Sequence, residues 1–74
     1  MSASNRNHPH PVLPMEPTAL VTERDVAALS SLSPAFLQKL RRNGTGPAFV
    51  RVGAAVRYPS GAVRAWLDTL SSQR

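Results

Sequence analysis

The sequence contains no cysteine, and it has only four acidic residues against nine lysines and arginines. Without cysteine, disulfides and thiolate metal sites are excluded, and nothing indicates an oxidising compartment. No apolar run approaches the roughly 20 residues that span a bilayer. The polar, proline-rich start lacks the apolar core of a signal peptide. We therefore expect a soluble, cytoplasmic protein with no membrane association.

Patterns typical of catalysis or cofactor binding are also missing. We find no paired-carboxylate motif, no metal-ligand spacing and no glycine loop that would cradle a phosphate. His8 and His10, the only two histidines, flank Pro9 without further ligands nearby and fit a solvated tail better than a metal site. We expect neither an enzyme nor a bound cofactor or metal.

Positive charge is what the sequence has in excess. Its 74 residues allow one small domain with a marginal core. The net charge is +5, and every cation except Lys39 is an arginine, the side chain best shaped for phosphates and guanine edges. Such a balance suits nucleic-acid binding, although a basic protein can simply be well solvated.

Proline content divides the chain. Residues 1–18 carry four of the seven prolines and no apolar periodicity, so we predict a disordered arm. Residues 19–71 form the predicted folded domain, and residues 72–74 a flexible tail.

The first predicted helix covers residues 23–30. Thr22 is a good N-cap, and Asp25 three residues later can complete a capping box. The serine-rich segment 30–33 then ends the helix.

A second helix is predicted over residues 34–43. Ser33 is its N-cap, Pro34 occupies the first helical position, and Gly44 suits a left-handed C-cap. Two short helices joined by a tight turn have helix-turn-helix geometry.

The two faces of this second helix differ in chemistry. At 100° per residue, one face is apolar and predicted to be core: Phe36, Leu37 and Leu40. The opposite face carries Ala35, Gln38 and Arg42, with Lys39 and Arg41 at its borders. A recognition helix needs this arrangement, with small or hydrogen-bonding side chains for base edges and cations for phosphates. A solvated helix face would look similar.

A β-hairpin is predicted next, with strands at 49–52 and 56–58 around a three-residue loop, 53–55. This register places Val50, Val52, Val56 and Tyr58 on one face. It places Arg51 and Arg57 side by side on the other, where a phosphate backbone would relieve their repulsion. A one-residue slip would destroy this sorting.

A closing helix is predicted from Ser60, as its cap, to about Leu70. Its apolar positions at helical spacing are Val63, Trp66, Leu67 and Leu70. Trp66 and Tyr58 could stack on single-stranded bases, but their apolar settings favour core positions.

Over residues 20–70 the chain resembles the excisionase and MerR-like winged helix-turn-helix family. The resemblance is carried by segments 20–23, 33–42, 44–53 and 56–67 in this order. It implies a mainly α fold with a small β-hairpin, a recognition helix in the major groove, and a wing on the minor groove or backbone. Members include excisionases, which bend DNA and help an integrase to excise, and small AlpA-like transcription regulators.

The chain departs from the family pattern at the turn and at the wing tip. Ser30 stands where an aliphatic residue is usual, and Ser31 where glycine is usual. The tip, usually basic, is Ala54 and Ala55. Most of the wing's charge must then come from its two arginines.

These observations predict a sequence-specific, double-stranded DNA-binding protein associated with the nucleoid. The base-reading residues are predicted to be Ala35, Gln38 and Arg42, the phosphate contacts Ser33, Lys39, Arg41 and Thr45, and the wing contacts Arg51 and Arg57. Because no effector domain is visible, we favour an excisionase that associates cooperatively with itself on DNA beside a site-specific integrase. The alternatives are a small transcription regulator on the same fold, and a protein-interaction module or inhibitor that uses the basic face.

Overall fold

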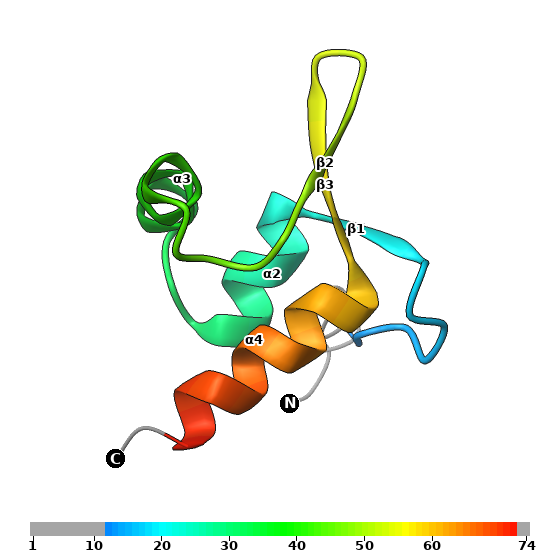
Figure 1. The fold of residues 1–74 in the computed structure, drawn as a ribbon, viewed down its shortest axis with the longest axis vertical. Coiled ribbons are helices and arrows are strands. Elements are labelled where there is room, and N and C mark those ends of the chain that lie inside the picture. Colours follow the sequence, from blue (N-terminus) through cyan, green and yellow to red (C-terminus); the bar gives the residue numbers. More distant parts are fainter. Residues whose placement is uncertain (1–11, 73–74) are drawn as a thin grey trace, which may run out of the picture.

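The computed structural model describes residues 12–72 and contains three helices and a three-stranded antiparallel sheet (Figure 1). In chain order the elements are β1 (Leu20–Thr22), α2 (Glu23–Ser30), α3 (Pro34–Asn43), β2 (Val50–Val52), β3 (Ala55–Pro59) and α4 (Ser60–Ser72). The predicted winged helix-turn-helix class is confirmed. Residues 1–11 of the predicted arm, with both histidines, and residues 73–74 of the predicted tail lie outside the described residues.

The two helices of the helix-turn-helix begin and end where their capping signals predict. The Thr22 hydroxyl accepts from the Asp25 backbone N–H at 3.0 Å, and the Asp25 carboxylate accepts from the Thr22 N–H at 3.2 Å, which completes the capping box. The Ser33 hydroxyl accepts from the Phe36 N–H at 3.1 Å. Gly44, with φ of 72°, ends α3.

The hairpin register differs from the prediction by one residue. The turn holds only Gly53 and Ala54, so that Val52 pairs with Ala55, Arg51 with Val56 and Val50 with Arg57. Gly53 has φ of 62°, and a positive φ at the first central residue is what a tight two-residue turn needs. Arg51 and Arg57 therefore lie on opposite faces of the sheet, and their predicted pairing is wrong.

A third strand, β1, lies on the other side of β3 and gives the sheet order β1-β3-β2. Val21 pairs with Tyr58, which turns both side chains toward the helices, where they are buried. The three residues of β1 are too few to show the alternating pattern of a strand. The only signal in this segment of the sequence was the N-cap of the following helix.

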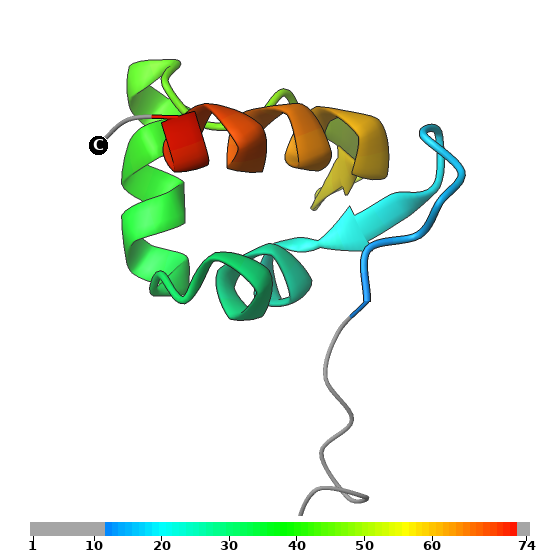
Figure 2. The same cartoon turned by 90° about the horizontal axis from the view of Figure 1, so that it is seen from below.

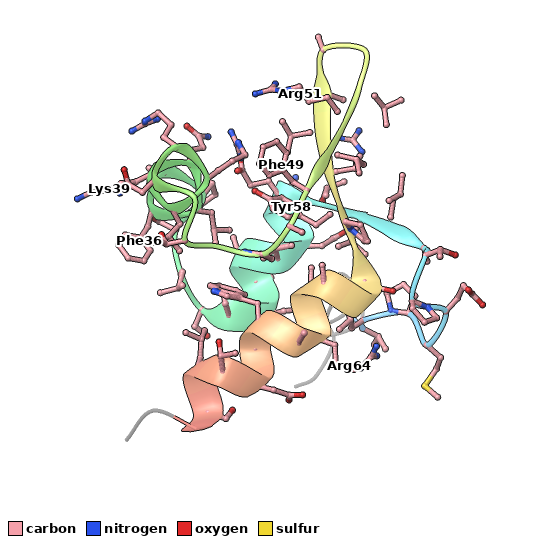
Figure 3. All side chains as sticks on the ribbon, viewed as in Figure 1. Phe36, Lys39, Phe49, Arg51, Tyr58 and Arg64 are labelled. Carbon is pink, nitrogen blue, oxygen red and sulfur yellow. The ribbon has the colours of Figure 1, made fainter. Side chains whose placement is uncertain are left out.

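The core lies between this sheet face and the three helices. Its buried residues are Val21, Val26, Ala27, Leu37, Tyr58, Val63 and Trp66. Trp66 and Tyr58 are thus core residues, as predicted. Phe36 is not, because 43% of it remains exposed. It lies 100° around α3 from Leu37, and its side chain points away from the sheet (Figure 3).

Residues 14–19 contact the start of α4, although the sequence predicts residues up to 18 as disordered. Backbone carbonyls of Pro17 and Ala19 accept from the N–H groups of Gly61 and Ser60 at 2.9 and 2.7 Å. The Ser60 hydroxyl, predicted to cap this helix, instead donates to the Glu16 carbonyl. Figure 2 shows this segment beside the first turn of α4. The first turn is capped by a neighbouring backbone, which local sequence rules do not reveal.

Candidate nucleic-acid interface

The outward face of α3 carries most of the predicted DNA contacts. Ala35, Gln38, Lys39 and Arg42 are all exposed on it, and Ser33 is exposed at its N-cap. The burial of Leu37, only 1% exposed, anchors the opposite side of the helix. Lys39 projects from α3 away from the body of the protein (Figure 3). The structure therefore brings this group of predicted residues together on one side of α3.

The hairpin rises beside α3 and adds Arg51 to the same side of the molecule (Figures 1 and 3). Arg51 is exposed, and its guanidinium carbon lies 5.7 Å from the centre of the Phe49 ring. This distance is within the range of a cation–π contact. Arg57, on the other sheet face, is half-buried, and its Nη1 donates to the Val56 carbonyl at 2.8 Å. Only one of the two predicted wing arginines faces the α3 side.

Beneath the edge of this surface, Glu23 of α2 joins side chains from α3 and β3. Its Oε2 forms an ion pair with Arg41 and accepts from the Tyr58 hydroxyl at 3.2 Å. Its Oε1 accepts from the Gln38 amide nitrogen at 3.2 Å. Arg41 Nη1 also donates to the Tyr58 hydroxyl at 2.9 Å. We call these four side chains the Glu23 cluster.

The Glu23 cluster keeps its carboxylate charged. Burial alone would raise the pKa of Glu23, but hydrogen bonds from Arg41, Gln38 and Tyr58 favour the charged form and lower its pKa below the ordinary value. Burial raises the pKa of the Tyr58 hydroxyl, which therefore stays a donor.

Two predicted phosphate contacts are engaged within the protein. The Arg41 side chain is only 18% exposed, and its guanidinium is held by Glu23 and Tyr58 and lies 5.7 Å from the Phe49 ring centre. The Thr45 hydroxyl donates to the Leu40 carbonyl at 3.4 Å, beside the C-terminus of α3. A helix C-terminus carries partial negative charge, which does not favour an anion.

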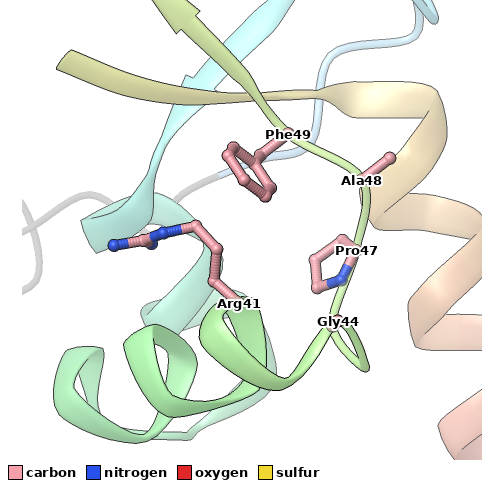
Figure 4. A pocket seen from close by; sticks show the side chains of 6 residues that line it. Arg41, Gly44, Pro47, Ala48 and Phe49 are labelled. Atoms are coloured by element: carbon pink, nitrogen blue, oxygen red, sulfur yellow. The ribbon is translucent and has the colours of Figure 1, made fainter. Parts of the chain in front are cut away.

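A shallow pocket of about 280 Å³ lies where α3 meets the loop to β2 (Figure 4). Its lining residues are Arg41, Gly44, Gly46, Pro47, Ala48 and Phe49. Within residues 12–72 there is no group of three His, Cys, Asp or Glu side chains able to hold a metal ion. None of the helices in that range is long and apolar enough to cross a membrane.

Sequence reasoning missed Glu23 as a member of this site. An acidic residue in the first turn of a helix is already explained by the helix dipole, so Glu23 gave no further signal. Its partners Arg41 and Tyr58 lie 18 and 35 residues further along the chain, and only folding brings them together.

One family model, described as a helix-turn-helix domain, matches residues 20–71, more than two thirds of the chain. The match begins with β1 and extends through α2, α3 and the hairpin to the last turn of α4. No curated protein and no solved structure matches the chain.

Proposed function

The chain belongs to the helix-turn-helix domain family, and from this premise we propose that it binds specific sequences of double-stranded DNA and serves as an excisionase. Family membership supports DNA binding. The excisionase role follows the resemblance of segments 20–23, 33–42, 44–53 and 56–67 to excisionases. In this role the protein acts by binding alone, and a site-specific integrase carries out the strand exchange.

One observation carries the proposal: α3 presents an exposed polar and basic face beside a hairpin that adds a cation to the same side. An α-helix fits the major groove of B-DNA, and a wing beside it can reach the adjoining backbone. Ala35, Gln38 and Arg42 at the centre of the exposed face then read base edges. Ser33 and Lys39 contact phosphates.

The wing supplies the second contact. Arg51 reaches the backbone from the side of the hairpin that faces α3, while Arg57 can add charge only from the opposite face. Arg41 and Thr45 contribute less than the sequence predicts, because their polar groups already have partners within the protein.

Several copies act together on one DNA segment in this proposal. A single module of this kind buries only about 600–1,000 Å², too little for high specificity. Bending a site costs on the order of 1–6 kcal/mol, which contacts from neighbouring copies offset. Such cooperative assembly would associate the protein with the nucleoid.

Alanine variants of α3 test the base-reading assignment. Arg42→Ala and Gln38→Ala should lower the preference for specific over random DNA by roughly 1–3 kcal/mol, as expected for a lost bidentate contact. Lys39→Ala should weaken binding to both DNAs alike. Equal discrimination by Arg42→Ala and the wild type in fluorescence-anisotropy titrations would contradict the assignment.

Footprinting and an excision assay test the biological role. An excisionase should protect an extended region cooperatively, and its expression beside the integrase should raise the amount of excised circle. A compact footprint with altered transcription from a nearby promoter, and no effect on excision, would indicate a regulator instead. Weak DNA binding with little salt dependence would indicate a protein-interaction module.

A further inference from the structure

Within the base-reading face of α3, the side chain of Gln38 is bonded inside the domain to Glu23 of α2. The amide nitrogen of Gln38 lies 3.2 Å from Glu23 Oε1, and this bond links α3 to α2. The other carboxylate oxygen, Oε2, is taken by Arg41 and Tyr58. The two oxygens of Glu23 therefore bind different side chains, and the hydrogen bond from Gln38 does not compete with the ion pair to Arg41.

The chemistry of the pair settles which way the Gln38 amide is turned. An ionised carboxylate can only accept hydrogen bonds, whereas an amide has an NH2 donor and a carbonyl acceptor. The NH2 group must face Glu23, because the amide oxygen in its place would repel the carboxylate. Gln38 thus directs its carbonyl oxygen away from Glu23 and keeps one N–H for another partner.

We propose that Glu23 is a positioning residue that makes Gln38 select adenine and reject guanine in the major groove. Adenine presents one acceptor, N7, and one donor, the N6 amino group, which match the free N–H and the carbonyl oxygen of Gln38. Guanine presents two acceptors, N7 and O6, and needs two donors. One of the two Gln38 N–H groups is already held by Glu23. This inference rests on the proposed DNA binding through α3.

Arg41 makes a carboxylate tolerable at this place. An unpaired negative charge near the DNA backbone would repel phosphates, but the ion pair with Arg41 neutralises Glu23 locally. The guanidinium that the sequence assigns to a phosphate therefore supports base selection indirectly.

The test measures base preference at one position with the full-length protein. Duplexes carrying each of the four base pairs at every position of the site are titrated, and Gln38→Ala identifies the pair that Gln38 reads. At that pair the wild type should prefer adenine to guanine by roughly 5- to 150-fold. Glu23→Gln should reduce this ratio severalfold, because glutamine at position 23 can accept or donate and no longer fixes the Gln38 amide.

Tyr58→Phe is the matched control. It removes the hydrogen bond to Glu23 Oε2 and leaves the bond between Oε1 and Gln38, so the adenine-to-guanine ratio should stay at its wild-type value. Preferences at the other positions should be unchanged in both variants, which a general loss of structure would not produce. If Glu23→Gln does not fold by circular dichroism, Glu23→Asp replaces it, since the shorter carboxylate withdraws from Gln38.

Three outcomes would overturn the inference: an unchanged ratio in the folded Glu23 variant, an equal loss in Tyr58→Phe, or a wild-type preference for guanine at that pair. Wild-type protein that discriminates no sequence at all would instead refute the proposed function. The two failures are therefore distinguishable in the same experiment.

Discussion

Ser31 holds a backbone conformation that side chains rarely adopt. It follows α2 with φ of 61° and ψ of 28°, and its N–H donates to the Ala27 carbonyl. Within residues 12–72 it is the only residue other than glycine with a positive φ. The left-handed conformation costs an L-residue roughly 1–2 kcal/mol. The family that this chain resembles usually has glycine at this position, and the left-handed turn geometry explains that preference.

Replacing Ser31 by glycine should therefore stabilise the domain. We expect Ser31→Gly to raise the free energy of unfolding by about 0.5–1 kcal/mol, because relief of the strain exceeds the added freedom of the unfolded chain. Urea denaturation measures the change. Ser30→Gly, one residue earlier and inside α2, is the matched control and should destabilise by a similar amount. A loss of stability in both variants would contradict the strain argument.

Glu23 should make the free energy of unfolding depend on pH in the acid range. Its pKa is lowered in the folded state from an ordinary value of 4.5, so its contribution is complete above pH 4.5 and disappears as the pH falls through the folded-state pKa. Glu23→Gln has no carboxyl at this position and should lose less stability over the same acid range. Urea midpoints of both proteins between pH 6 and pH 3 give the comparison. Parallel curves would show that the carboxylate is not coupled to folding.

Among the elements, the strand register of the hairpin is set by a single turn. Gly53 permits a two-residue turn, and the resulting register turns Arg51 toward α3 and Arg57 to the outer face. Val50 and Val52, predicted to share a face with Val56 and Tyr58, are instead 39% and 56% exposed on that outer face. The wing therefore presents Arg51 toward α3, and the two exposed valines with the half-buried Arg57 on the side away from it.

The two wing arginines should differ in their effect on binding. Arg51→Ala should weaken binding to all sequences and reduce the slope of log K against log salt by about 1, as expected for one lost phosphate contact. Arg57→Ala should change affinity less, since its guanidinium lies on the other face and donates to the Val56 carbonyl. Fluorescence-anisotropy titrations at several salt concentrations decide this. An equal loss in both variants would mean that the outer face of the hairpin contacts DNA.

In the molecule as a whole, three exposed cations share the side of α3. Lys39 and Arg42 on α3 and Arg51 on the hairpin are exposed on one side, while Arg41 is paired internally. Arg64 lies near the opposite end, where its Nη2 donates to the Pro14 carbonyl at 3.2 Å (Figure 3). Lys39, Arg42 and Arg51 thus supply exposed positive charge on the α3 side.

Phosphate contacts should dominate the affinity for DNA. If Lys39, Arg51 and Arg57 neutralise about two to three phosphates per protomer, log K should fall with log salt with a slope of about −2 to −3, at about −0.9 per phosphate. Arg64→Ala should leave this slope unchanged, because its guanidinium holds the N-terminal segment on the side away from α3. A flat salt dependence of the wild type would refute DNA binding through this surface.

The local elements of this protein could be predicted from its sequence. Both helices of the helix-turn-helix have their predicted bounds, because the signals at Thr22, Ser33, Pro34 and Gly44 act within a few residues of each helix end. The exposed polar face of α3 followed from helical periodicity alone.

Other features depend on residues that are far apart in the chain, and only the fold sets them. It paired β1 with β3, capped α4 with the backbone of residues 17–19, left Phe36 half-exposed and placed Arg51 and Arg57 on opposite faces. It also brings four side chains into one hydrogen-bonded cluster: Glu23, Gln38, Arg41 and Tyr58. These arrangements follow from strand register and from contacts between elements far apart in the chain, whereas capping and periodicity describe only neighbours along it.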